Sequence, residues 1–169
     1  MSQAKKEALM SESFDNFVKD LQNKIFEQTR AEYGDVAFQR WLKPLYMGTM
    51  DNPDGYGRIT GSCGDTIQMF LKFENGKVKS ALFQTDGCGS SAVCGSFAAE
   101  LALGKSPEEI FDISGESILK KLGNFPEEDK HCAFLSVEAL QDAGNEYMVK
   151  QEKKKGERDK GMSLCCEDQ

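Results

Sequence analysis

The sequence contains no long apolar run, and this absence argues against a membrane-spanning protein. Nowhere do roughly 18 uncharged apolar residues follow one another, which is the length that a transmembrane helix needs. The first ten residues include two lysines and a glutamate and lack the apolar core of a secretory signal. We therefore expect a cytoplasmic protein without a membrane partner.

Positive charge is also scarce. The chain has 21 lysines and arginines against 28 aspartates and glutamates, which gives a net charge of −7. No cluster of basic residues is accompanied by aromatic side chains, so a nucleic-acid partner is not expected. With 169 residues, 39% of them apolar, and no internal repeat, the chain is long enough for one globular domain with some tail.

Cysteine is too infrequent for a small protein held together by disulfide bonds. Only six of the 169 residues are cysteine, whereas cysteine makes up roughly 8–10% of the residues in a disulfide scaffold. In a reducing compartment, thiols more often bind a metal or take part in chemistry. No compact C-x-x-C zinc motif is present, so the spacing of the cysteines does not identify a metal.

The periodicity of apolar residues predicts a helix over residues 11–29. Its apolar side chains recur at steps of three and four and share one stripe, with solvent on the opposite face: Phe14, Phe17, Val18, Leu21 and Ile25. A shorter helix is predicted over residues 36–42, and it should end near Pro44 because the residue before proline avoids the helical region.

Two β-rich runs, Thr66–Phe73 and Val78–Thr85, predict a hairpin. The residues between them include Asn75-Gly76, which supplies the positive φ angles that a tight hairpin turn needs. A short third strand is expected over residues 56–60. One face of the first run is more apolar than the other, so we expect helices to cover that face.

Four further helices are expected after the hairpin. The first covers residues 90–103, the second is a short turn that starts at Ser106-Pro107, and the third covers residues 118–122. The fourth is a long helix that begins near Glu127. Beyond residue 150 the sequence is charged and offers almost nothing apolar to bury, so we expect a solvated helix end and a disordered tail.

Three cysteines lie where a loop joins a regular element. Cys63 stands between glycines in Gly61-Ser62-Cys63-Gly64-Asp65, Cys88 precedes the small-residue helix, and Cys132 follows the only histidine, His131. A position near a helix N-terminus lowers the pKa of a thiol, and this is expected for Cys132.

Each of these residues also has an ordinary explanation. A lone buried cysteine acts as a small apolar side chain, a lone histidine at a helix start is most often a surface residue, and Asp65 alone would be a turn residue. Three thiols in glycine-flanked or capping positions favour a shared site. The spacings of 25 and 44 residues between them leave the metal unidentified.

Three motifs occur together in this sequence: Cys63-Gly64-Asp65, Thr85-Asp86-Gly87-Cys88-Gly89-Ser90-Ser91 and His131-Cys132. Glu100 and Gly104-Lys105-Ser106 follow the second motif. Residues 41–147 thereby resemble the U-type iron–sulfur cluster assembly scaffolds, which are IscU-like proteins and the N-terminal domain of NifU. The resemblance implies an α+β fold, a three-stranded antiparallel sheet with helices packed on one face. It divides the chain into an N-terminal helical extension (1–35), an iron–sulfur scaffold domain (36–150) and a charged tail (151–169).

The resemblance also implies a function, which is assembly of a transient [2Fe-2S] cluster rather than enzymatic catalysis. It assigns Cys63, Asp65, Cys88 and Cys132 as ligands, with His131 as an alternative. Sulfur would come as a persulfide from a cysteine desulfurase, with Cys132 as the first choice of acceptor, and the cluster would pass to apo iron–sulfur proteins. Because a carboxylate oxygen binds such iron less firmly than a thiolate, Asp65 should make the cluster labile.

The chain departs from the family pattern at several positions. The chaperone-binding stretch Leu-Pro-Pro-Val-Lys is replaced by Phe125-Pro126-Glu127-Glu128-Asp129, which argues against dependence on an Hsp70-type chaperone. Lys43-Pro44-Leu45-Tyr46-Met47-Gly48 replaces an Asn-Pro-x-Asn-x-Gly loop. Cys94 is expected to fill the core, and the pair Cys165-Cys166 has no assigned role. The sequence leaves open whether one protomer or a homodimer holds the cluster.

Two other functions compete with the scaffold. A zinc-dependent, SufU-like sulfurtransferase shares the Cys-Gly-Asp motif, but its insertion between the second and third cysteines has no room in a 44-residue spacing. An interaction module with a structural zinc would need neither a labile aspartate nor glycine-opened loops. Zinc in aerobically purified protein would not decide among them, because the same ligands bind zinc well.

Overall fold

The computed structural model describes residues 3–163, with side chains described over residues 12–157. The elements follow in the order α1 (Gln3–Leu42), β1 (Gly55–Thr60), β2 (Thr66–Glu74), β3 (Lys77–Thr85), α2 (Gly89–Ala102), α3 (Pro107–Ile110), α4 (Gly115–Leu122), a 3-10 turn η1 (Glu127–Asp129) and α5 (His131–Ser163). The last helix therefore begins at His131 and not near Glu127, because the residues before it make the shorter hydrogen bonds of a 3-10 turn. The Cys165-Cys166 pair lies outside the described residues.

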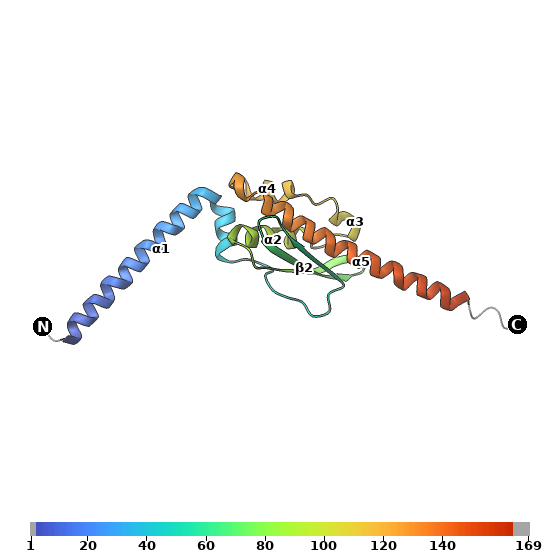
Figure 1. Ribbon diagram of the computed structural model, residues 1–169, viewed down its shortest axis with the longest axis horizontal. Coiled ribbons are helices and arrows are strands. Elements are labelled where there is room, and N and C mark those ends of the chain that lie inside the picture. Colours follow the sequence, from blue (N-terminus) through green and yellow to red (C-terminus); the bar gives the residue numbers. More distant parts are fainter. Residues whose placement is uncertain (1–2, 164–169) are drawn as a thin grey trace.

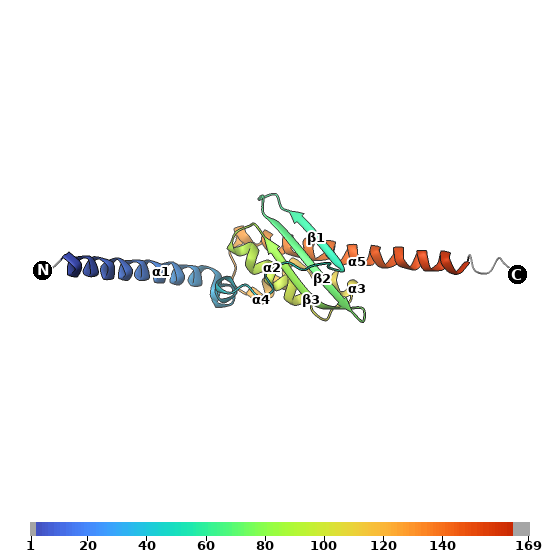
Figure 2. The same cartoon turned by 90° about the horizontal axis from the view of Figure 1, so that it is seen from below.

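The three strands form one antiparallel sheet in the order β1-β2-β3. Asn75 and Gly76 both have positive φ, 52° and 75°, so the hairpin turn forms as its sequence predicts. One face of the sheet is buried under helices, with α5 against β1 and β2 and α2 against β3 (Figure 2). The buried side chains of this face are Ile67, Met69, Leu71, Val78, Ala81 and Phe83. The expected α+β fold is confirmed.

A bend divides α1 into two parts. Gly34 has φ 78° and ψ 166°, a conformation that glycine adopts readily and that interrupts the helix between the two segments expected from the sequence. In the part after the bend, Ala37 and Phe38 are buried in the globular body. Arg40 stacks on the ring of Phe97 at 3.9 Å and pairs with Glu100. This part of α1 is therefore anchored to α2.

The part of α1 before Gly34 projects from one end of the globular body, and the C-terminal half of α5 projects from the other (Figure 1). The apolar stripe over residues 14–25 consequently remains largely exposed. Among the described residues, none of the helices combines the length and the apolar character that crossing a bilayer requires.

Candidate metal centre

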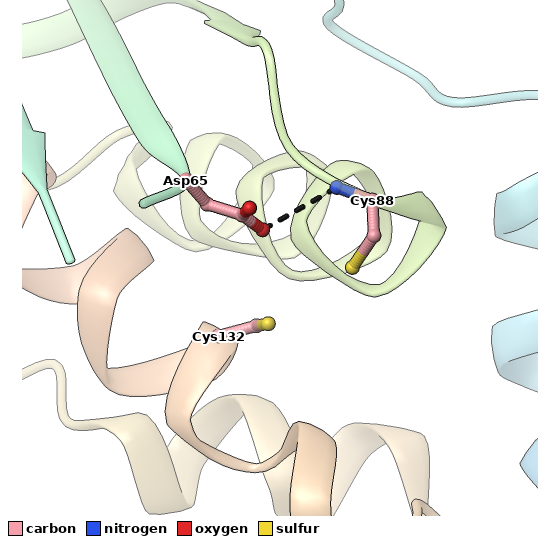
Figure 3. A group of neighbouring side chains, drawn as sticks. All are labelled: Asp65, Cys88 and Cys132. Carbon is pink, nitrogen blue, oxygen red and sulfur yellow. Dashed lines mark hydrogen bonds between the residues drawn. The ribbon is translucent and has the colours of Figure 1, made fainter. Parts of the chain in front are cut away.

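Three segments far apart in the sequence bring Asp65, Cys88 and Cys132 together at one end of the sheet (Figure 3). One ligand atom from each residue lies within 4.8 Å of the other two. The register of the hairpin explains the first contact. Ile67 pairs with Thr85, so Asp65, just before β2, and Cys88, just after β3, lie at the same end of the sheet. Cys132 is the second residue of α5, which packs against the same sheet.

Cys88 caps the N-terminus of α2 with an extended backbone, φ −73° and ψ −179°. Its own N–H donates to Asp65 Oδ2 at 3.3 Å. Gly87 allows this approach, because a Cβ at position 87 would lie 2.4 Å from Asp65 Oδ2. The glycine before Cys88 is therefore needed for the carboxylate to occupy its place.

The hydroxyl of Ser91 lies among the three candidate ligands. Ser91 is fully buried, and its Oγ donates to Asp65 Oδ2 at 2.6 Å. The same oxygen lies 3.4 Å from Cys132 Sγ and 3.8 Å from Cys88 Sγ. The hydrogen bond from Ser91 is the main cause that lowers the pKa of Asp65, and it outweighs the partial burial of the carboxyl. The carboxylate is therefore held in its charged form.

Ser91 has no predicted role in the sequence motifs. A signal was available, because Ser91 follows Cys88 by three residues and so occupies the same face of α2. Serine at such a position is common in a helix, and only the buried contact with Asp65 distinguishes it.

The pKa of the Cys132 thiol differs from the value expected from the sequence. Its side chain is buried, and burial raises the pKa of the thiol to about 12. The expectation of a lowered pKa is therefore wrong for the thiol as it lies in this structure, because loss of hydration outweighs the hydrogen bond from Ser91, which lowers the pKa. A metal ion would reverse this preference, because coordination removes the proton from a thiol.

His131 lies beside this group. Its Nδ1 is 2.6 Å from the carbonyl oxygen of Glu128, which can only accept, so Nδ1 carries a proton. In the neutral ring this leaves the lone pair on Nε2, which lies 3.5 Å from Cys132 Sγ. The imidazole can thus offer a nitrogen ligand at the edge of the candidate metal centre.

Cys63, like His131, is a predicted ligand that does not belong to the group of ligand atoms within 4.8 Å of one another. It is exposed, in the loop between β1 and β2, two residues before Asp65. Hydrogen bonds from Gly61 N–H to the Asp65 carbonyl and from Gly64 N–H to the Gly61 carbonyl close this loop, at 2.9 and 3.0 Å. Cys94, by contrast, is fully buried in the core cluster, as its interpretation as core filler requires.

The comparisons with known proteins identify the family. Residues 32–154 match the family described as NifU-like N terminal domain. The chain belongs to this family. It is 31% identical over 136 residues to "Iron-sulfur cluster assembly scaffold protein IscU 1" of Archaeoglobus fulgidus, which covers 80% of this chain and 86% of the relative. It is 35% identical over 129 residues to "Iron-sulfur cluster assembly enzyme IscU" of Drosophila melanogaster, with 73% and 83% covered.

Two solved structures share the fold of this NifU-like domain. The N-terminal NifU-like protein of Brucella abortus superposes with a TM-score of 0.60 at 15% identity, covering 72% of this chain and 97% of that one. The protein described as "Putative iron-sulfur cluster assembly scaffold protein for SUF system (FiSufU)" from Fervidobacterium islandicum superposes with a TM-score of 0.56 at 18% identity, covering 69% of this chain and 98% of that one. At these identities the likeness establishes the fold alone.

A cavity of about 320 Å³ opens beside Cys88 in this NifU-like domain. It lies between α1 and α2, and its lining includes Tyr33, Trp41 and Asp129. The indole of Trp41 lies so close to Gly89 that a Cβ there would be 2.4 Å from Nε1. Asp129 accepts hydrogen bonds from the hydroxyls of Tyr33 and Ser90, each at 2.6 Å, and so ties η1 to both helices.

Proposed function

We propose that this chain is a scaffold that assembles a [2Fe-2S] cluster from iron and desulfurase-derived sulfur and transfers it to apo-proteins. The observation that carries the proposal is the approach of Asp65, Cys88 and Cys132 to within 4.8 Å in a chain of the NifU-like N-terminal family. Relatives of this chain carry names that describe cluster assembly, mostly as scaffolds. The cluster is then the cargo of the protein and not a resident cofactor.

The proposed ligands are Cys63, Cys88 and Cys132, with Asp65 as the fourth. Two soft sulfurs and one hard oxygen already lie together, and Cys63 is exposed on the adjoining loop. Thiolates suit iron–sulfur clusters, whereas a carboxylate holds such iron less firmly. His131 Nε2, which lies against Cys132 Sγ, is the proposed alternative ligand when the carboxylate is displaced.

Cys132 is the proposed acceptor of sulfur. Its thiolate would attack the outer sulfur of a desulfurase persulfide, forming Cys132–S–SH and releasing the desulfurase thiolate. Because Cys132 is buried, the first turn of α5 has to open. Opening would break the hydrogen bond between His131 and the Glu128 carbonyl and the two hydrogen bonds that Asp129 of η1 accepts. Mass spectrometry after desulfurase turnover should find the persulfide on Cys132, and a persulfide confined to Cys63 or Cys88 would contradict this assignment.

The experiment that tests the function is metal analysis of protein purified without oxygen. Iron and acid-labile sulfide in equal amounts support the scaffold. Alanine at Cys63, Cys88 or Cys132 should abolish stable reconstitution, whereas Cys94→Ala should retain it, because Cys94 is buried in the core. Zinc alone, with stimulation of the desulfurase, would support a zinc-dependent sulfurtransferase instead. Loss of the cluster in Cys94→Ala would contradict the ligand assignment.

A further inference from the structure

The part of α1 that precedes the bend carries an apolar stripe in solvent. Its side chains are between 41% and 65% exposed: Phe14, Phe17, Val18, Leu21 and Ile25. At 3.6 residues per turn all of them fall within an arc of about 100°. The opposite side of the helix is polar, and its residues include Glu12, Asn16, Lys19, Asn23 and Glu27.

An apolar arc of this width is typical of a helix that packs against another element. Helices draw most of their stability in proteins from such packing. The globular body does not supply it here, because the stripe projects beyond the body (Figure 1). The stripe therefore calls for a partner from outside the described chain.

The charge around the stripe argues against a lipid surface as that partner. Helices that lie on membranes carry a polar face rich in lysine and arginine, which pairs with anionic headgroups. Residues 12–28 contain four acidic side chains and only two lysines, so an anionic surface would repel this helix.

The spacing of the stripe fits a second copy of the same helix. Phe14, Val18, Leu21 and Ile25 are separated by steps of four, three and four, which is the spacing of alternating core positions in a two-stranded coiled coil. We propose that the projecting parts of α1 from two molecules pair in antiparallel orientation. This inference does not rest on the proposed function.

In this pairing the apolar layers match between the two molecules. Phe14 lies opposite the partner's Ile25, and Val18 lies opposite the partner's Leu21. The flanking positions bring no like charges together, because Asp15 faces the partner's Gln22 and Phe17 faces the partner's Lys24. The methylene groups of Lys24 can cover the ring of Phe17 while its ammonium stays in water.

The position of the globular body decides the direction. The body follows α1 directly after the bend, so parallel helices would bring two bodies together at the same end (Figure 1). Antiparallel helices place the bodies at opposite ends. The pairing is centred between Lys19 and Asp20, so the two copies of Thr29, which lines the cavity beside Cys88, lie roughly 28 Å apart along the axis. Each protomer therefore keeps its own metal centre, and no cluster is shared.

Sedimentation velocity of the full chain over a range of concentrations tests the pairing. Because the contact involves one helix per molecule, we expect a reversible dimer that forms at micromolar concentrations. Leu21→Glu should abolish dimerisation. Asn16→Glu adds the same charge on the polar face of the same helix and should leave the dimer intact. A wild-type chain that is monomeric at 0.2 mM, or a Leu21→Glu variant that still dimerises, would overturn the proposal.

A charge exchange tests the direction of the helices. Phe14→Glu and Ile25→Lys should each weaken the dimer, and the double variant should restore it, because Glu at 14 then faces Lys at 25 in both layers. In a parallel pair the double variant would place like charges opposite each other and remain monomeric, which would overturn the antiparallel arrangement. Iron and sulfide per protomer should be unchanged in Leu21→Glu, so failure of the pairing is distinguishable from failure of the scaffold function.

Discussion

Replacement of Ser91 by alanine should destabilise the metal-free protein through a single hydrogen bond. The Ser91 hydroxyl donates to the ionised Asp65 carboxylate at 2.6 Å and is fully buried. A hydrogen bond to a charged group contributes about 1.5–3 kcal/mol, and because Asp65 is only partly buried we expect the lower end of that range. A loss of about 1.5 kcal/mol in the free energy of unfolding would lower the melting temperature by about 3–6 °C for a chain of this length.

The assay is urea unfolding of the wild type, Ser91→Ala, Asp65→Ala and the double variant at pH 7. If the hydrogen bond to Asp65 carries the effect, Ser91→Ala should cost less than about 0.5 kcal/mol once Asp65 is already alanine. The pH dependence has a defined sign. The pKa of Asp65 is lowered in the folded state, so its stabilisation is present at neutral pH and is lost as the pH falls through that pKa.

Ser136→Ala is the matched control. Ser136 is also fully buried, but its hydroxyl donates only to the Cys132 carbonyl within the same helix, at 2.7 Å. Its removal should cost less than about 1 kcal/mol, because that carbonyl keeps its helical partner. Equal destabilisation by Ser91→Ala and Ser136→Ala, or full additivity of Ser91→Ala and Asp65→Ala, would refute the reasoning.

Three further predictions concern the same site. Asp65→Ala should keep the cluster longer in air and transfer it more slowly to an apo-ferredoxin, because the hard ligand is gone; faster loss of visible absorbance would contradict this. Gly87→Ala would place a methyl group 2.4 Å from Asp65 Oδ2, so it should weaken zinc binding about tenfold or more. Competition with a chelator measures this affinity, and an unchanged affinity would show that the carboxylate is dispensable for zinc binding. Trp41, the only tryptophan, lines the cavity beside Cys88, so assembly of a cluster should quench its fluorescence. Zinc has a filled d shell and should not quench it. Fluorescence that does not change on cluster assembly would mean that the cluster binds elsewhere.

Local chemistry explains why much of the fold could be predicted. The Asn75-Gly76 turn, the buried apolar face of β2 and the proline of Ser106-Pro107 depend on a few neighbouring residues, and each forms as expected. The start of α5 was misplaced for an equally local reason, because Glu127–Asp129 form a 3-10 turn whose composition suits an ordinary helix start.

The candidate site was predictable in part, and the reason lies in its motifs. The resemblance named Asp65, Cys88 and Cys132, and the sheet register and α5 bring them together. Cys63 belongs to the same motif, but its sulfur is not in the group of ligand atoms within 4.8 Å of one another, and it lies on the exposed loop between β1 and β2. It remains a predicted ligand.

The sequence by itself determined most of the helices and strands, the family resemblance and the residue types available for binding a metal. Tertiary structure alone decided that Cys132 is buried with a raised pKa, that the Ser91 hydroxyl holds Asp65, and that none of the described residues covers the stripe on α1. The physical reason is the same in each case. Hydration, burial and contacts between residues distant in sequence depend on how elements pack, whereas periodicity and turn preference act between neighbours along the chain.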